Sequence, residues 1–245
     1  MEQLNGAVTK AALYSRHAMA PKTPKPPITP ANDMDKIRTA KRADKDESLA
    51  PSSGAVRPEG APVHGIVQEQ QLNPLVYVCP LSLVPFAIAR HQPSHLVTLL
   101  DPEIAVPTPQ GIVAERHLRL GVHDVAQQRV DLTHPTADHV EDLLKFVSRW
   151  DHRSPLLIHC FAGISRSTAA AFVTMCNFNE PGHEHEIAWA LRVRAPHAQP
   201  NRLIVALADE ILGRRGRMVR AIDAIGPGQV VFEGDIFGVP LRPGI

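Results

Sequence analysis

The chain has 245 residues, of which 44% are hydrophobic and 21% charged, and its formal net charge at pH 7 is +1. This length accommodates one sizeable domain together with terminal segments. The nearly neutral charge argues against a nucleic-acid-binding surface as the main feature of the protein. No apolar run approaches the roughly 20 residues that cross a bilayer, and the first twenty residues lack a secretory-signal pattern. With three cysteines and no disulfide framework, we expect a soluble cytoplasmic protein that binds no membrane.

Residues 1–70 differ in composition from the rest of the chain. Five prolines crowd between residues 21 and 30, and a stretch of mixed charge follows over residues 33–47. A segment with so little apolar surface cannot offset the entropy lost on ordering. We therefore expect a disordered N-terminal arm over residues 1–70, ahead of a domain over residues 71–226.

The first half of that domain alternates between two kinds of hydrophobic pattern. Short apolar runs indicate buried strands, and apolar residues at a spacing of three or four indicate helices. Thr136 is a suitable N-cap, and Pro85 places the start of a helix near itself. We predict strands over residues 75–79, 95–100, 116–122 and 156–158, and helices over residues 82–90 and 136–150.

The second half of the domain is helical. Pro200 and Asn201 precede one of its helices, and Asn201 is a good N-cap. The first predicted helix of this half follows Ser167 and ends at residue 177. Three further helices are predicted over residues 184–194, 202–212 and 217–225. Alternating strands and helices followed by a helical half indicate an α/β fold with a central, mostly parallel sheet flanked by helices. A C-terminal tail, residues 227–245, is apolar enough to fold back onto the domain or to meet a partner.

One loop carries most of the chemical information in the chain. A buried-type strand leads into His159-Cys160-Phe161-Ala162-Gly163-Ile164-Ser165-Arg166-Ser167, and an alanine-rich helical stretch follows. At a loop that opens a helix, backbone N–H groups and the helix dipole favour an anion, and they also favour a thiolate. Arg166 can hold a phosphate through two hydrogen bonds. These features predict an oxyanion cradle with Cys160 as the nucleophile, against the alternative of a buried structural cysteine and a surface arginine.

These nine residues resemble the HCx5R(S/T) signature of the cysteine-dependent protein tyrosine phosphatases, in the form typical of the dual-specificity branch. The similarity extends over roughly residues 75–213, and we expect a bacterial member. It implies a central sheet with helices on both faces and hydrolysis of phosphotyrosine, with phosphoserine and phosphothreonine as further candidates. It also implies a cysteinyl-phosphate intermediate, no metal or other cofactor, and a phosphorylated protein or peptide as the partner.

The resemblance assigns a role to each residue of the loop. Cys160 is the nucleophile, Arg166 binds the phosphoryl group, and Ser167 donates a hydrogen bond to the departing thiolate. Ser165 steadies the loop, and His159 orients it through a ring N–H. The substrate-binding residues are Phe161, Ala162, Gly163, Ile164, Ser165 and Arg166.

Two aspartates are candidates for the general acid. The resemblance implies an aspartate on a loop after a strand, ahead of the cysteine. Asp124 directly follows the predicted third strand, whereas Asp131 lies beside the next helix cap. We favour Asp124, keep Asp131 as the alternative and set Asp101 aside because it lies too far upstream. The alternative interpretation of Asp124 is an aspartate that only closes a turn after the strand. For Asn201 we expect a capping role and no contact with substrate.

Two other functions remain open. Phosphoinositide or inositol-phosphate phosphatases often carry loop lysines, and this loop has none. A pseudophosphatase that binds phosphoproteins without turnover is disfavoured because nucleophile, arginine and acid are all present.

The remaining histidines and cysteines suggest two further sites, which we do not adopt. Two histidine pairs, His183 with His185 and His134 with His139, lack the third and fourth partners of a zinc site. Cys79 ends a strand of the same sheet, so a reversible disulfide with Cys160 is a further hypothesis.

Overall fold

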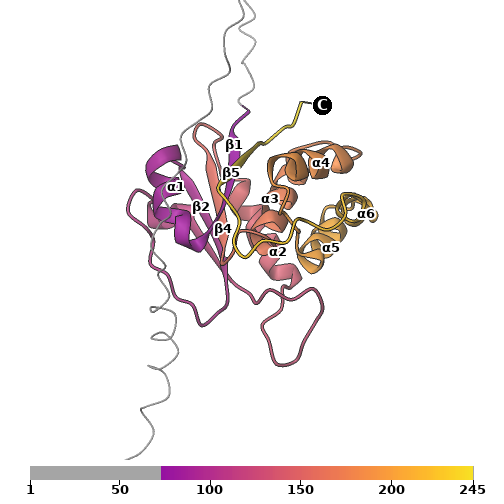
Figure 1. Ribbon diagram of the computed structural model, residues 1–245, viewed down its shortest axis with the longest axis horizontal. Helices are drawn as coiled ribbons and strands as arrows, with labels where there is room; N and C mark the ends of the chain where they lie inside the picture. Colours follow the sequence, from indigo (N-terminus) through magenta and orange to yellow (C-terminus); the bar gives the residue numbers. More distant parts are fainter. Residues whose placement is uncertain (1–72, 245) are drawn as a thin grey trace, which may run out of the picture. The chain divides into compact units, whose positions relative to one another are not determined.

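The computed structural model describes residues 73–244, which form a five-stranded sheet with helices on both faces (Figure 1). The predicted disordered arm, residues 1–70, lies outside the described residues. The order of the strands across the sheet is β3-β2-β4-β1-β5. The strands are β1 (Leu75–Pro80), β2 (His95–Leu100), β3 (His117–Gly121), β4 (Leu156–Cys160) and β5 (Phe237–Pro240).

Four of the strands run parallel. β4 lies at the centre and pairs with β1 on one side and β2 on the other, and β2 also pairs with β3. The sheet therefore confirms the predicted α/β class with a mostly parallel sheet. β5 is antiparallel to β1, with Val239 opposite Val76. This strand lies in the segment that was predicted as a C-terminal tail, and it folds back onto the domain.

The helices divide unequally between the two faces of the sheet. α1 packs against one face of the sheet over a small core cluster. The helices from α2 to α6 lie on the other face, over the larger core (Figure 1). Within the described residues, no helix has the length and hydrophobicity that a membrane span requires. The helices are α1 (Val84–His91), α2 (Ala137–Val147), α3 (Arg166–Asn177), α4 (Glu184–Arg194), α5 (Arg202–Ile211) and α6 (Arg217–Ala224).

The alternation of side chains along the strands explains how the core is built. Val76 and Val78 in β1 and Ile158 in β4 belong to the larger cluster, whereas Cys79 and Leu157 belong to the cluster under α1. Because successive side chains of a strand point to opposite faces, β1 and β4 each contribute to both cores. A sheet buried on both faces accounts for the nearly continuous apolar runs in the sequence.

The ends of the elements differ from the predictions by a few residues. A 3₁₀ turn, Leu81–Leu83, precedes α1, and Pro85 lies in the first turn of that helix. α2 ends at Val147 and not at Trp150, whose indole N–H turns away to the carbonyl oxygen of Ser154 at 2.8 Å. Thr136 does cap α2, and it shares a reciprocal capping box with His139.

Candidate active site

The strand β4 ends at Cys160, and the helix α3 begins at Arg166, so the five residues between them form a tight loop. The sulfur of Cys160 is buried in this loop. It accepts a hydrogen bond from the amide of Gly163 at 3.3 Å and lies 3.1 Å from the hydroxyl of Ser167. The Gly163 amide and the Ser167 hydroxyl therefore converge on one sulfur atom, and both can donate hydrogen bonds to it.

The carbonyl groups of the loop are held outward by other parts of the chain. The amide of Leu81 donates to the oxygen of Phe161 at 3.1 Å, and the amide of Gly234 donates to the oxygen of Ala162 at 2.9 Å. In a trans peptide, C=O and N–H point in opposite directions, and residues 73–244 contain no cis peptide. The amides of Ala162 and Gly163 consequently point inward.

The second half of the loop is held in the same way. The amides of Gln199 and Asn201 donate to the oxygens of Ile164 at 2.9 Å and Ser165 at 3.2 Å. The hydroxyl of Thr168 donates to both of these oxygens, at 2.6 and 2.9 Å. The amides of Ser165 and Arg166 therefore also point into the loop. Several inward N–H groups at a helix N-terminus are an arrangement that can bind an anion.

Gly163 is the one loop position where only glycine fits. Its φ angle is +72°, and a Cβ atom there would lie 2.7 Å from the nitrogen of Pro80 and 2.9 Å from the carbonyl carbon of Cys79. Both obstacles are backbone atoms of β1 and cannot swing aside. The close approach of the loop to β1 brings the Gly163 amide to the sulfur.

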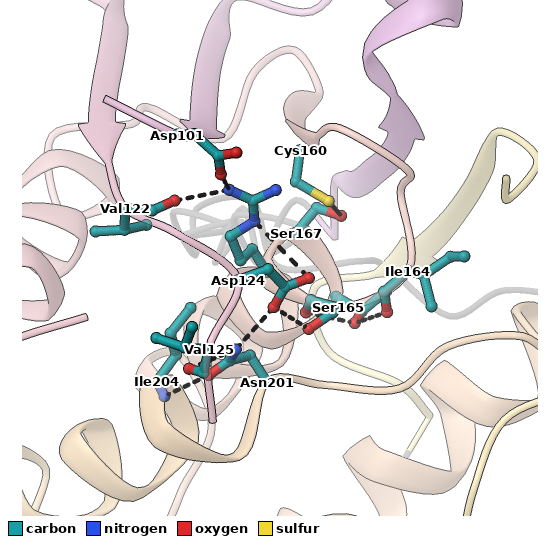
Figure 2. A network of polar contacts seen from close by, with 12 residues as sticks. Asp101, Val122, Asp124, Val125, Cys160, Ile164, Ser165, Ser167, Asn201 and Ile204 are labelled. Atoms are coloured by element: carbon teal, nitrogen blue, oxygen red, sulfur yellow. Dashed lines mark hydrogen bonds and ion pairs between the residues drawn. The ribbon is translucent and has the colours of Figure 1, made fainter. Parts of the chain in front are cut away.

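Arg166 is buried with its guanidinium anchored on one side and free on another. Its Nη1 donates to Asp101 at 2.6 Å and to the carbonyl oxygen of Val122 at 2.7 Å (Figure 2). Its Nε is buried and has no hydrogen-bond acceptor among residues 73–244, although a carboxylate oxygen of Asp124 lies 3.9 Å away. A buried N–H of this kind is costly unless an oxyanion accepts its hydrogen bond.

Asp124 lies beside the loop and contacts it directly. One of its carboxylate oxygens accepts hydrogen bonds from the hydroxyl of Ser165 at 2.7 Å and from the side-chain amide of Asn201 at 2.9 Å (Figure 2). Asn201 also caps α5, because its side-chain oxygen accepts from the amides of Leu203 and Ile204 at 3.1 Å. Asn201 thus has the predicted capping role and a second contact that the sequence did not indicate.

Asp131 lies apart from the loop. Its two carboxylate oxygens pair with the guanidinium of Arg129 at 3.1 and 2.8 Å on the surface. The hydrogen bond from Arg129 lowers the pKa of Asp131, which makes this carboxyl a poorer proton donor near neutral pH. Of the two candidate acids, Asp124 is the one whose carboxylate contacts the loop.

Cys79 is a neighbour of the loop, but its side chain points the other way. In the register of β1 and β4, Cys79 lies opposite His159 and Pro80 lies opposite Cys160. Cys79 packs in the cluster under α1, whereas Cys160 packs in the larger core. Burial, together with the nearby Cys160, raises the pKa of Cys79 to about 12. The alternation of the strand therefore argues against the Cys79–Cys160 disulfide hypothesis.

Two of the four histidines singled out in the sequence have other partners. His139 belongs to the capping box of α2, and the ring of His185 accepts from the indole of Trp189 at 2.9 Å. Among residues 73–244, no three His, Cys, Asp or Glu side chains lie close enough together to hold a metal ion.

The sequence analysis did not predict the roles of two residues at the site, Asp101 and Gly234. Asp101 was considered only as an acid, but it is the carboxylate that anchors Arg166; a strand ending in Asp at the same sheet edge is the signal that indicates it. Gly234 comes from the predicted tail and holds the loop through a backbone bond. Residue types do not indicate which distant backbone groups hydrogen-bond to each other, because every non-proline residue carries the same N–H and C=O.

Comparisons with known proteins match the chain to solved structures only, since no family model and no curated protein matches it. In structure, the chain is similar to phosphatases of the dual-specificity and protein tyrosine phosphatase type. DUSP15 is 20% identical with a TM-score of 0.46, over 62% of this chain and 96% of that one. The human tyrosine phosphatase-like serine/threonine/tyrosine-interacting protein is 19% identical with a TM-score of 0.41, over 55% and 85%. PTPMT1 in complex with PI(5)P is 16% identical with a TM-score of 0.42, over 58% and 94%.

Proposed function

We propose that this chain is a cysteine-dependent phosphatase that hydrolyses phosphotyrosine in proteins or peptides, with phosphoserine and phosphothreonine as further substrates. The observation that carries the proposal is the convergence on the Cys160 sulfur of the Gly163 amide and the Ser167 hydroxyl, inside a loop of inward N–H groups. A nucleophile and an anion-binding cradle at the same point are what thiolate attack on a phosphoester requires.

The first step forms a bond between sulfur and phosphorus. The Cys160 thiolate attacks the phosphoryl group in line, and the bond from phosphorus to the leaving oxygen breaks. Arg166 and the loop amides take up the charge on the equatorial oxygens, and the unpaired Nε of Arg166 becomes satisfied. Asp124, when protonated, gives its proton to the leaving oxygen.

The second step releases phosphate. Water attacks phosphorus, Asp124 accepts a proton from that water, and the bond between phosphorus and sulfur breaks. Cys160 leaves as a thiolate that accepts the hydrogen bond from Ser167, 3.1 Å away. Asp124 ends protonated, ready for the next cycle, and no metal or organic cofactor takes part.

The contacts of Asp124 support this assignment. Ser165 and Asn201 hold one carboxylate oxygen, which leaves the second oxygen, 3.9 Å from Arg166 Nε, on the side of the phosphate cradle. A carboxyl group in this position can reach an oxygen of a bound phosphoester.

Hydrolysis of p-nitrophenyl phosphate without added metal tests the proposal. We expect turnover by the wild type, no detectable turnover by Cys160→Ser, and a fall in kcat of about 10²- to 10⁴-fold for Asp124→Asn. Asp131→Asn is the matched control and should keep the wild-type rate, because within residues 73–244 the Asp131 carboxylate hydrogen-bonds to Arg129 alone. Full activity in Asp124→Asn together with loss in Asp131→Asn would overturn the acid assignment.

Phosphorylated substrates then define the specificity. We expect phosphotyrosine peptides to be turned over faster than inositol phosphates, because the loop offers no lysine for additional phosphates. Faster turnover of a phosphoinositide would replace the proposed substrate. Tight binding of phosphopeptides by a folded wild type without any turnover would identify a pseudophosphatase instead.

A further inference from the structure

A line of buried polar side chains crosses the sheet from the active-site strand to the edge strand. The hydroxyl of Thr98 in β2 lies 2.7 Å from Nε2 of His159 in β4 and 2.8 Å from Nε2 of His117 in β3. The Nδ1 atom of His117 lies 3.1 Å from the hydroxyl of Thr108. Three adjacent strands thus contribute one side chain each to a continuous chain of hydrogen bonds.

At each end of this series of hydrogen bonds lies a group that can only accept or can only donate. At the inner end, Nδ1 of His159 lies 3.3 Å from the carbonyl oxygen of Cys160, and a carbonyl oxygen only accepts. At the outer end, Nη2 of Arg119 donates to the hydroxyl of Thr108 at 2.6 Å, and a guanidinium only donates. The two ends therefore impose a direction on everything between them.

The direction follows atom by atom from the inner end. His159 must carry its proton on Nδ1, so its Nε2 accepts from Thr98. The hydroxyl of Thr98 has a single proton, so it accepts from Nε2 of His117. His117 then carries its proton on Nε2, and its Nδ1 accepts from Thr108. Thr108 accepts from Arg119, as the outer end independently requires.

Both rings are neutral in this arrangement, which agrees with their surroundings. Burial lowers the pKa of His159 to about 4. Burial, and then the charge of Arg119, lower the pKa of His117 to about 4. A neutral imidazole has one donor and one acceptor nitrogen, so it can pass a hydrogen bond on in one direction.

We propose that Thr98 and His117 are positioning residues of the active site, which act by holding His159 in the tautomer that binds the Cys160 carbonyl. That carbonyl belongs to the peptide whose N–H is the amide of Phe161. When this oxygen is held outward, the Phe161 amide points into the phosphate cradle. Other segments hold further carbonyl oxygens of the loop in the same way. The proposal rests on the proposed function, since it concerns the loop of the same site.

The direct test reads the tautomers by ¹⁵N NMR of histidine-labelled full-length protein at pH 7. We expect His159 to be protonated on Nδ1 and His117 on Nε2, with neither ring charged. In Thr98→Val, which keeps the shape of the side chain and removes the hydroxyl, His159 should lose its single tautomer. A wild-type His159 protonated on Nε2 would overturn the proposal, and this readout does not depend on any phosphatase activity.

Kinetics separate positioning from simple destabilisation. With p-nitrophenyl phosphate, Thr98→Val should lower kcat about tenfold and change KM by less than about twofold, because the Phe161 amide acts on the developing charge. Thr98→Ser, which restores the hydroxyl, should recover most of the rate and the single His159 tautomer. Thr98→Val with unchanged kcat and an unchanged His159 tautomer would contradict the proposal even if its thermal stability fell.

Discussion

The amide of Gly234 donates a hydrogen bond to the carbonyl oxygen of Ala162, 2.9 Å away, although the two residues lie far apart in the sequence. This oxygen shares a peptide with the Gly163 amide that donates to the sulfur of Cys160. The segment after α6 is therefore part of the scaffold of the loop around Cys160. A second contact, from Ser82 to Glu233 at 2.6 Å, fixes the same segment to the turn before α1.

Gly234→Ala should damage the loop. A Cβ atom at this position would overlap the ring of His197, so the segment must move and the bond to Ala162 is lost. We expect a free energy of unfolding lower by about 1–3 kcal/mol and a kcat lower by about tenfold. Urea unfolding and p-nitrophenyl phosphate kinetics measure both. Gly244→Ala is the matched control, since a Cβ there meets nothing within 4 Å; equal effects of the two changes would contradict the assignment.

Asp101→Asn should weaken the binding of phosphate. Asp101 and the Val122 oxygen hold Nη1 of Arg166, and the loss of the charged partner allows the guanidinium to leave its position. We expect kcat/KM to fall about 10- to 100-fold and inhibition by inorganic phosphate to weaken in parallel. Glu103→Gln provides the comparison, because Glu103 is exposed and, within the part of the chain that the structure describes, forms an ion pair with His123 and not with Arg166. Unchanged phosphate inhibition in Asp101→Asn would show that Asp101 does not position Arg166.

The buried histidines make stability depend on pH. The pKa values of His117 and His159 move from 6.5 to about 4 on folding, so the unfolded chain binds these protons at a higher pH than the native protein does. Their stabilisation is complete above about pH 6.5 and is lost as pH falls toward 4. For His159 it amounts to about 3 kcal/mol. Urea unfolding at several pH values should show this fall, and a shallower one in His117→Gln; a constant free energy between pH 7 and pH 4.5 would exclude it.

Oxidation should distinguish the three buried cysteines. Burial raises the pKa of Cys79 to about 12 and also raises that of Cys176, so neither forms a thiolate at neutral pH. We expect mild hydrogen peroxide to oxidise Cys160 to the sulfenic and then the sulfinic acid. Intact-mass and peptide analysis should detect no Cys79–Cys160 disulfide, because the two side chains point to opposite faces of the sheet. Such a disulfide in the wild type would contradict this geometry.

The sequence predicts the elements well where a local rule determines them. The strand over residues 95–100 and the helix over residues 184–194 occur with the predicted ends, since hydrophobic spacing sets both. The N-cap of α5 at Asn201 follows from a side chain that satisfies free amides. β5 was not predicted, because four residues after a loop become a strand only by pairing with β1.

The candidate site was predictable to a similar extent. Cys160, Arg166 and Ser167 lie in one motif, and the structure brings the Ser167 hydroxyl to the Cys160 sulfur, while Arg166 is buried at the first position of α3. Asp124 follows from its place after a strand. The parts that were missed act across strands: Asp101 on Arg166, Thr98 between two histidines, and Gly234 on Ala162. Strand order and register bring these residues together, and neither can be read from residue types along the chain.

The central claim is that the phosphoryl group is transferred to the sulfur of Cys160 before water releases it as phosphate. The most direct measurement mixes Asp124→Asn with p-nitrophenyl phosphate, quenches in acid within milliseconds to seconds, and locates any added phosphoryl group by peptide mass spectrometry. We predict one phosphoryl group on the peptide that contains Cys160, and none in Asp124→Asn combined with Cys160→Ser. A phosphoryl group on another residue, or sustained turnover by Cys160→Ser, would contradict the mechanism.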